Sequence, residues 1–196
     1  MVKKIAIIGT AFGSIDDDLI SKCYELGEWI SANKLITITG ACPGISYYVA
    51  KASLKNGGEV IGYSPGRNLE EHINSFNFPS EGFSKLKFVK EKYEINEVYF
   101  RRSLDVIHMA DIVISIDGGR GTMSELFLAT FFAKKIICVS FSGGATKEYI
   151  KIYKHLKDIN ISYGEKLLVA TSLEDIKKEI LNFINKDKRG KNVGSK

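Results

Sequence analysis

Short apolar runs alternate with helix-period segments from one end of this chain to the other. Apolar runs of five or six residues are typical of strands buried on both faces, and such strands occur in parallel sheets whose crossover helices cover each side. The pattern therefore predicts an α/β fold of three layers, α/β/α, around a mainly parallel sheet of about seven strands. The runs predict strands near 4–9, 35–39, 59–63, 86–90, 112–116, 136–140 and 167–170. The helix-period segments predict helices near 16–33, 44–56, 96–109, 121–133, 146–156 and 173–185.

The composition predicts a single domain over residues 1–185. With 196 residues and 44% apolar content, the chain is long enough for one substantial core. Residues 186–196 contribute much of the formal net charge of +5, and their polarity is typical of a disordered tail. Because the tail accounts for much of the basic excess, the charge does not favour a nucleic acid as partner.

No apolar stretch approaches the roughly 20 residues of a membrane span, and no signal-peptide pattern opens the chain. A cytoplasmic protein with no membrane partner is expected. Its three cysteines, Cys23, Cys42 and Cys138, are widely spaced, which argues against a disulfide framework. The histidines lack metal-ligand spacing, so we expect neither a metal nor a cofactor. Cys42 precedes a predicted helix start, which leaves two interpretations open: a thiol with a lowered pKa, or a small buried residue.

Residues 118–125 carry the sharpest chemical signal, because they join the apolar run 112–116 to a new helix. The glycines allow a tight turn and close approach to a ligand, and the free N–H groups of the helix's first turn favour an anion such as phosphate. Glu125 falls one turn inside that helix, where a carboxylate can face the ligand. The alternative is an ordinary turn capped by Thr122. The phosphate interpretation assigns the ligand to Gly118, Gly119, Arg120, Gly121 and Thr122.

Other glycine-bearing loops also follow predicted strands. Ligands of open parallel sheets bind outside the carboxyl ends of the strands, so these loops are further candidates. The chain lacks both GxGxxG and GxxxxGK[ST], which disfavours an NAD dehydrogenase and a P-loop NTPase. The glycines of the first loop have the alternative role of simply allowing the turn. The nucleotide-binding candidates in the first two loops are Gly9, Thr10, Gly13, Ser14, Gly40 and Gly44.

Two further segments are candidates for a role at this edge of the sheet. The stretch 64–85 shows no sustained period, and it is interpreted either as a substrate-covering loop or as a surface excursion. Arg101 and Arg102 lie on the helix before the fifth strand, and adjacent helical residues point about 100° apart. Only one of the two arginines is therefore expected to face the site.

From Lys3 to about Tyr153 the sequence resembles the LONELY GUY (LOG) family and its Rossmann-like relatives, a superfamily often labelled "possible lysine decarboxylase". The family's PGGxGTxxE motif is matched by residues 117–125, and its upstream arginine, in a helix that ends in Ala-Asp, is matched by Arg102. The resemblance implies a nucleoside 5′-monophosphate phosphoribohydrolase, which cleaves the N-glycosidic bond and releases a base and ribose 5-phosphate. It also implies that Arg102 and Glu125 are catalytic, that the ligand is a small-molecule nucleotide, and that the protein is a homodimer.

Three positions depart from that family's pattern. Asp117 replaces the motif proline, Ser103 stands where the family usually has lysine, and residues 40–44 replace a run of three glycines. The last of these loops is similar to relatives involved in DNA processing or molybdenum-cofactor carriage. The alternative function is therefore a non-catalytic protein that binds or carries a nucleotide or the molybdenum cofactor. Asp117 would also repel a neighbouring phosphate unless Arg120 or a helix terminus compensates.

Overall fold

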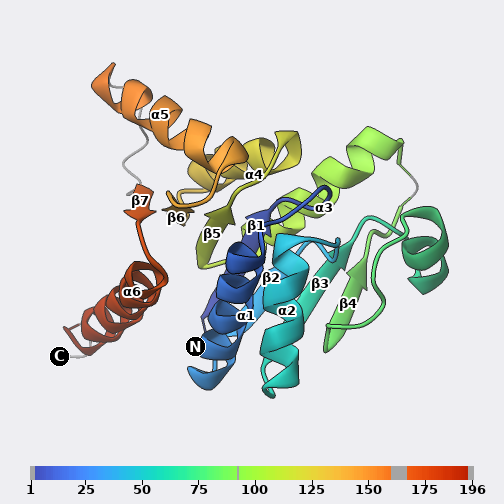
Figure 1. The fold of residues 1–196 in the computed structure, drawn as a ribbon, viewed down its shortest axis with the longest axis horizontal. Coiled ribbons are helices and arrows are strands. Elements are labelled where there is room, and N and C mark those ends of the chain that lie inside the picture. The colour runs from blue at the N-terminus through green and yellow to red at the C-terminus, as the bar shows by residue number, and fades with distance from the viewer. Residues whose placement is uncertain (1–2, 92, 160–166, 194–196) are drawn as a thin grey trace.

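The computed structural model describes residues 3–91, 93–159 and 167–193, with side chains as far as residue 186. Seven strands form one sheet in the order β4-β3-β2-β1-β5-β6-β7, and every neighbouring pair is parallel (Figure 1). This parallel sheet with helices on both faces confirms the predicted α/β class. The strands are β1 (Lys4–Gly9), β2 (Ile36–Thr39), β3 (Glu59–Ser64), β4 (Lys85–Phe88), β5 (Ile112–Ile116), β6 (Lys135–Val139) and β7 (Leu167–Ala170).

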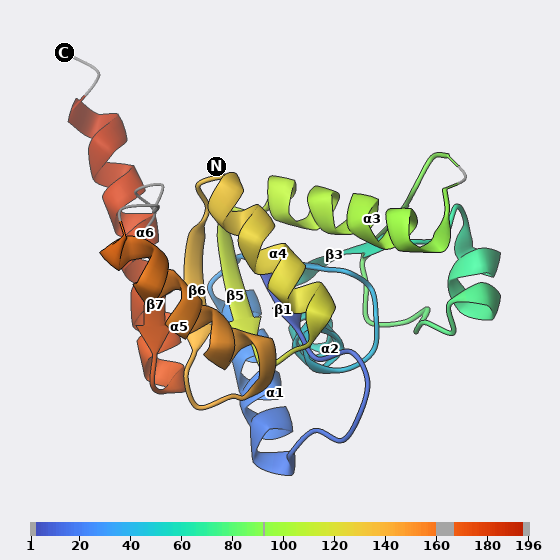
Figure 2. The ribbon, with the colours of Figure 1, turned by 90° about the horizontal axis from the view of Figure 1, so that it is seen from above.

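Two helical layers cover the sheet, as Figure 2 shows from above. Helices α1, α2 and α6 contribute to one buried cluster, and α3, α4 and α5 contribute to the other. The six helices are α1 (Asp17–Ala32), α2 (Ile45–Lys55), α3 (Ile95–Met109), α4 (Arg120–Phe131), α5 (Gly144–Asp158) and α6 (Leu173–Val193). Among the described residues, no helix has the length and apolar character needed to cross a membrane.

The central strands are buried on both faces, which explains their continuous apolar sequences. In β1, Ile5 and Ile7 pack into the cluster under α1 and α2, while Ala6 and Ile8 pack into the cluster under α3 and α4. Successive side chains of a strand point to opposite faces, so a strand covered on both sides needs apolar residues at every position. The apolar runs in the sequence therefore reflect the burial of these strands under helices on both faces of the sheet.

Two segments differ from their expected conformation. The stretch 64–85 includes one π-helical turn, η1 (Glu71–Ser75), around the buried His72. Helix α6 continues to Val193, so the backbone is helical where the composition indicated a disordered tail from residue 186. Lysine and arginine are good helix formers, and the preceding turns of α6 are held against the sheet by residues such as Ile180. Residues 194–196 of the expected tail lie outside the described residues.

Candidate functional site

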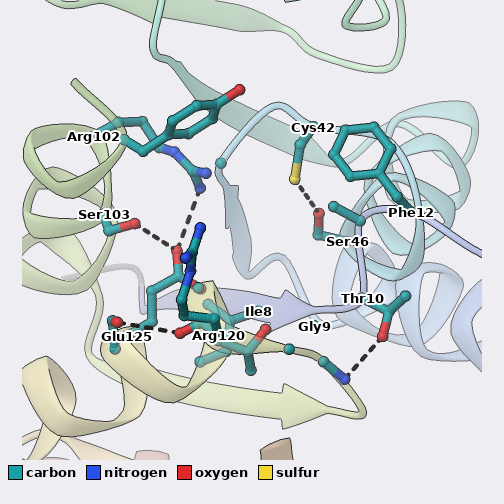
Figure 3. Close-up of a pocket in the computed structure, with 18 of the residues that line it drawn as sticks. Ile8, Gly9, Thr10, Phe12, Cys42, Ser46, Arg102, Ser103, Arg120 and Glu125 are labelled. Carbon is teal, nitrogen blue, oxygen red and sulfur yellow. Dashed lines mark hydrogen bonds and ion pairs between the residues drawn. The ribbon is translucent and has the colours of Figure 1, made fainter. Parts of the chain in front are cut away.

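A cavity of about 760 Å³ opens at the carboxyl ends of β1 and β5, where the strand order of the sheet reverses. Strands β1 to β4 extend in one direction from this point and β5 to β7 in the other, so the loops after β1 and β5 diverge and leave a crevice. The cavity is lined by residues of the loops after β1, β2 and β5, the first turns of α4, and one face of α3 (Figure 3).

Arg102 and Glu125 meet in this cavity. The Nη1 atom of Arg102 lies 3.3 Å from Oε1 of Glu125, and the Ser103 hydroxyl donates a hydrogen bond of 2.9 Å to the same oxygen. The two charged side chains are only 11% and 8% exposed. Arg101 instead points outward and pairs with Glu97, so α3 presents Arg102 to the cavity and Arg101 to the surface. The structure thus brings together the two residues that the sequence resemblance singled out.

Burial shapes the ionisation of this cluster. Desolvation raises the pKa of Glu125, and the Arg102 charge and the Ser103 hydrogen bond only partly oppose it. Desolvation also raises the pKa of the Cys42 thiol, again with Arg102 acting in the opposite direction. The interpretation of Cys42 as a thiol with a lowered pKa is therefore wrong, because it is desolvated and its nearest polar partner is the Ser46 hydroxyl at 3.8 Å.

The amino end of α4 faces the cavity with free hydrogen-bond donors. Gly119 occupies the N-cap position and no side chain caps this helix, so Thr122 does not act as its cap. Within the described structure, the N–H groups of residues 119–122 have no acceptor, and all four residues line the cavity. Free first-turn donors and the positive end of the helix dipole favour an anion at this position.

Hydrogen bonds hold both the backbone N–H and the carboxylate of Asp117. It adopts a left-handed conformation, with φ at 58°, and its N–H donates to the Ser142 hydroxyl at 2.8 Å. The Thr10 hydroxyl donates to the Asp117 carboxylate at 2.6 Å and accepts the Gly118 N–H at 2.9 Å. Proline has φ fixed near −65° and no N–H, so it fits neither feature of this position. Replacement of the motif proline therefore accompanies a distinct backbone conformation.

Gly40 makes room for the arginine. A Cβ atom on Gly40 would lie 1.6 Å from Nη1 of Arg102, so only glycine lets the guanidinium occupy its present position. Gly9 lines the cavity too, but it also packs closely against the backbone of β5, where a Cβ would lie 2.3 Å from the carbonyl oxygen of Ile116. The two glycines therefore shape the cavity through the space that they leave.

Three of the predicted binding residues lie outside the cavity lining. Gly13 and Ser14 are exposed farther along the loop after β1, and Gly44 packs against the carbonyl oxygen of Thr10 at the start of α2. By contrast, the cavity is lined by Gly9, Thr10, Gly40 and each of Gly118, Gly119, Arg120, Gly121 and Thr122. Proximity in sequence to a strand end thus selects the correct loops but not every residue within them.

Sequence reasoning missed several lining residues. Asn96, Tyr99 and Ser103 recur at intervals of three and four residues on α3, so they form one row along the helix, and the helical period counted from Tyr99 would have identified this row. Phe12 gave no such signal, because a single aromatic residue in a loop has no periodicity. Among the described residues, no group of three or more histidine, cysteine, aspartate or glutamate side chains could hold a metal ion.

The chain, with its parallel sheet and with a glycine-rich loop and Glu125 of α4 at the switch point, is a member of the LOG-like and DprA-like SLOG superfamily. The chain belongs to the SLOG cluster4 family, whose sequence profile matches residues 2–176.

Solved structures of the same fold cover nearly the whole chain. The X-ray structure of TM1055 has a TM-score of 0.76 at 21% identity and covers 92% of this chain and 99% of that chain. The molybdenum cofactor binding protein from Rippkaea orientalis has a TM-score of 0.71 at 21% identity, with 94% and 98% covered. DNA processing protein A from Helicobacter pylori has a TM-score of 0.63 at 17% identity, with 92% and 80% covered. At these identities the likeness establishes the fold alone.

Proposed function

We propose that the protein is a nucleoside 5′-monophosphate phosphoribohydrolase that releases a free base and ribose 5-phosphate. The observation that carries this proposal is the buried Arg102–Glu125 pair, which lines the same cavity as the free N–H groups at the start of α4. The N–H groups would bind the 5′-phosphate, and Glu125 lies on the same helix about one turn further along. A phosphorylated ribose held at the helix terminus would thus place its reacting carbon near the carboxylate.

The reaction follows from the charge that develops on the sugar. As the bond from C1′ to the base nitrogen breaks, its electron pair stays on the base and the ribose becomes oxocarbenium-like. The Glu125 carboxylate stabilises this cation and positions the water whose oxygen bonds to C1′. One proton of that water ends on the departing base, and the other remains in the new hydroxyl of ribose 5-phosphate. Arg102 keeps Glu125 ionised and oriented against the desolvation that raises its pKa.

A second candidate function is binding or carriage of a nucleotide or the molybdenum cofactor without turnover. It is favoured by the similarity to the molybdenum cofactor binding protein over 94% of this chain. It is also favoured by Asp117 and Ser103, which differ at this cavity from the proline and lysine of the LOG pattern on which the hydrolase assignment rests. Within this interpretation the same cavity holds the ligand, and the Arg102–Glu125 pair serves binding only.

Base release separates the two candidates. Wild-type protein and Glu125→Gln should be incubated with a panel of nucleoside 5′-monophosphates and the products separated by chromatography. We expect wild type to release one or more bases and Glu125→Gln to lose at least about 10²-fold in rate, because the substitution keeps the shape but removes the charge that stabilises the cation. Full activity in Glu125→Gln would contradict the catalytic role. Tight binding without release by wild type would favour the carrier.

We also propose that the protein acts as a cytoplasmic homodimer. The free cysteines are compatible with a reducing compartment. An apolar hollow of about 500 Å³ lies between α4 and α5, lined largely by aromatic and aliphatic side chains that include Phe127 and Phe131. Phe131 is 77% exposed. A contiguous exposed apolar surface of this kind is typical of a protein interface, and a second copy of the chain would cover it.

A further inference from the structure

Phe12 is an exposed aromatic side chain at the opening of the cavity. It lies on the loop after β1, lines the cavity, and is 69% exposed. Figure 3 shows it on the side of the cavity away from Arg102 and Ser103. Covering an exposed apolar side chain gains hydrophobic free energy, and a ligand bound in the cavity would lie beside Phe12.

Phe12 is supported from behind. Its ring centroid lies 6.4 Å from that of Phe78, which is buried and packs edge-on against His72 with 5.7 Å between centroids. The imidazole of His72 is held by the Ser64 hydroxyl and the Pro79 carbonyl, each at 2.9 Å. One part of the Phe12 ring is thus packed on a fixed cluster while the rest remains open, so the loop presents an aromatic surface rather than a freely rotating side chain.

The same segment supports the opposite wall. Phe76 packs edge-on against Tyr99 of α3, with 5.8 Å between ring centroids. The stretch 65–84 therefore does not line the cavity itself. Its residues Phe78 and Phe76 instead pack against Phe12 and Tyr99, which do line the cavity. This contact pattern explains why a segment without sustained sequence periodicity is nevertheless packed around a buried histidine.

The residues of α3 that line the cavity become more buried toward Ser103. Asn96 and Phe100 are exposed, Tyr99 is partly buried, and Ser103 is fully buried beside Glu125. The cavity thus has an aromatic, open end and a charged, desolvated end, with the free N–H groups of α4 also at its lining. A ligand that combines a planar heterocycle with a phosphorylated sugar matches this distribution of groups.

From this arrangement we propose that Phe12 is the residue on which the base of the nucleotide stacks. The inference rests on the proposed function for the identity of the ligand and adds the means by which its heterocycle is held. Stacking uses the π-face that every base possesses, so the contact accepts several bases and favours the larger purines. Selection among purines would then depend on polar groups at the base edge, for which Asn96 is the exposed amide of the lining.

The test measures nucleotide and sugar-phosphate binding separately. Dissociation constants for AMP, UMP and ribose 5-phosphate are determined by calorimetry for Phe12→Ala and Phe12→Tyr, in the Glu125→Gln background so that nucleotide is not consumed. Phe141→Ala is the matched control, because Phe141 is also an exposed phenylalanine but does not line the cavity. We expect Phe12→Ala to weaken AMP binding about 5- to 150-fold and to leave ribose 5-phosphate binding unchanged. Phe12→Tyr and Phe141→Ala should retain AMP binding.

The outcomes separate this inference from the proposed function. Unchanged AMP affinity in Phe12→Ala, equal losses for AMP and ribose 5-phosphate, or the absence of AMP binding before Phe12 is changed would each overturn the stacking role. Base release by wild type, together with unchanged affinity in Phe12→Ala, would leave the hydrolase intact and overturn the inference alone. Loss of AMP affinity in Phe12→Ala without any base release by wild type would support stacking and contradict the hydrolase.

Discussion

One carboxylate oxygen organises the centre of the cavity. Oε1 of Glu125 accepts hydrogen bonds from both Arg102 and Ser103, so two donors from α3 hold one acid of α4. Arg102 is the cation that pairs with Glu125, and its charge also acts on the Cys42 thiol and the Tyr99 hydroxyl, whose pKa values are raised by burial. Ser103 stabilises the charged form of Glu125 without adding a charge of its own, which a lysine at this position would do.

Ser103→Ala should move the acidic limb of the pH–rate profile to higher pH. The proposed reaction needs ionised Glu125, so activity falls as the pH drops through the pKa of this carboxyl group. The Ser103 hydrogen bond lowers that pKa against the larger effect of burial, and its loss raises the pKa further. The measurement is kcat against pH for wild type, Ser103→Ala and Ser103→Thr. The threonine variant keeps the hydroxyl and should retain the wild-type limb; an unshifted limb in the alanine variant would contradict the positioning role.

Gly40→Ala should impair the site while leaving the fold intact. The added methyl group meets the far end of a flexible side chain, so Arg102 is displaced and no backbone has to move. A displacement of about 1 Å in a catalytic group can cost about 10²-fold in rate, and we expect a loss of kcat of that order. Kinetics and the melting temperature are measured together. Wild-type kcat with an unchanged melting temperature would show that Arg102 does not need its present position.

At the scale of elements, the loop between β5 and α4 is held by its neighbours. The loop after β1 supplies Thr10, and the start of α5 supplies the N–H of Ala145, which donates to the Gly118 carbonyl at 2.7 Å. These contacts occupy the Gly118 N–H and the Gly118 carbonyl, and they leave the N–H groups of residues 119–122 for a ligand. The glycine-bearing loop 142–144, which follows β6, therefore supports the proposed anion site without lining it.

Introducing the proline of the LOG motif through Asp117→Pro should destabilise the protein. The substitution requires φ near −65° where the chain has 58°, and it removes the N–H that donates to Ser142. We expect the free energy of unfolding to fall by more than about 1 kcal/mol, measured by urea denaturation. Asp117→Asn is the control, because asparagine tolerates the left-handed conformation and keeps the N–H. Equal stability of the proline variant and wild type would contradict the backbone assignment.

At the scale of the whole molecule, the exposed apolar surface over α4 and α5 adjoins the cavity. Phe100 and Ser124 line both the site cavity and the apolar hollow, so a partner that binds over α4 and α5 would lie beside any ligand in the cavity. The two features share the walls formed by α3 and α4. Assembly and ligand binding are therefore expected to influence one another.

Phe131→Glu should convert the proposed dimer to a monomer. The side chain is 77% exposed in the single chain, so a charge there leaves the fold intact but opposes burial in an interface. Sedimentation at micromolar concentration should give twice the chain mass of 21.8 kDa for wild type and a single chain mass for the variant. Leu69→Glu, a similar change at another exposed apolar residue, should stay dimeric. A monomeric wild type would remove the dimer proposal.

The layers, the strands and the edge of the sheet at which the cavity opens could all be predicted from the amino-acid sequence. Buried parallel strands must be apolar on both faces, so the apolar runs predicted the bounds of β1 and β5 correctly. The loop after β5 could be recognised from its high glycine content. The motif also predicted the place of Glu125 one turn inside α4, because its spacing from the helix start is local.

The contacts between residues that are distant in the chain could not be predicted from local sequence patterns. Gly40 leaves space for the Arg102 guanidinium, and the Thr10 hydroxyl forms hydrogen bonds with Asp117 and Gly118. The ring of Phe78 packs against that of Phe12. Each of these contacts joins residues that are far apart in the sequence. Gly13, Ser14 and Gly44 follow strands as the lining residues do, yet they lie outside the cavity lining. Local patterns record how each segment is buried, whereas contacts between loops depend on the strand order and on the direction in which each loop leaves the sheet.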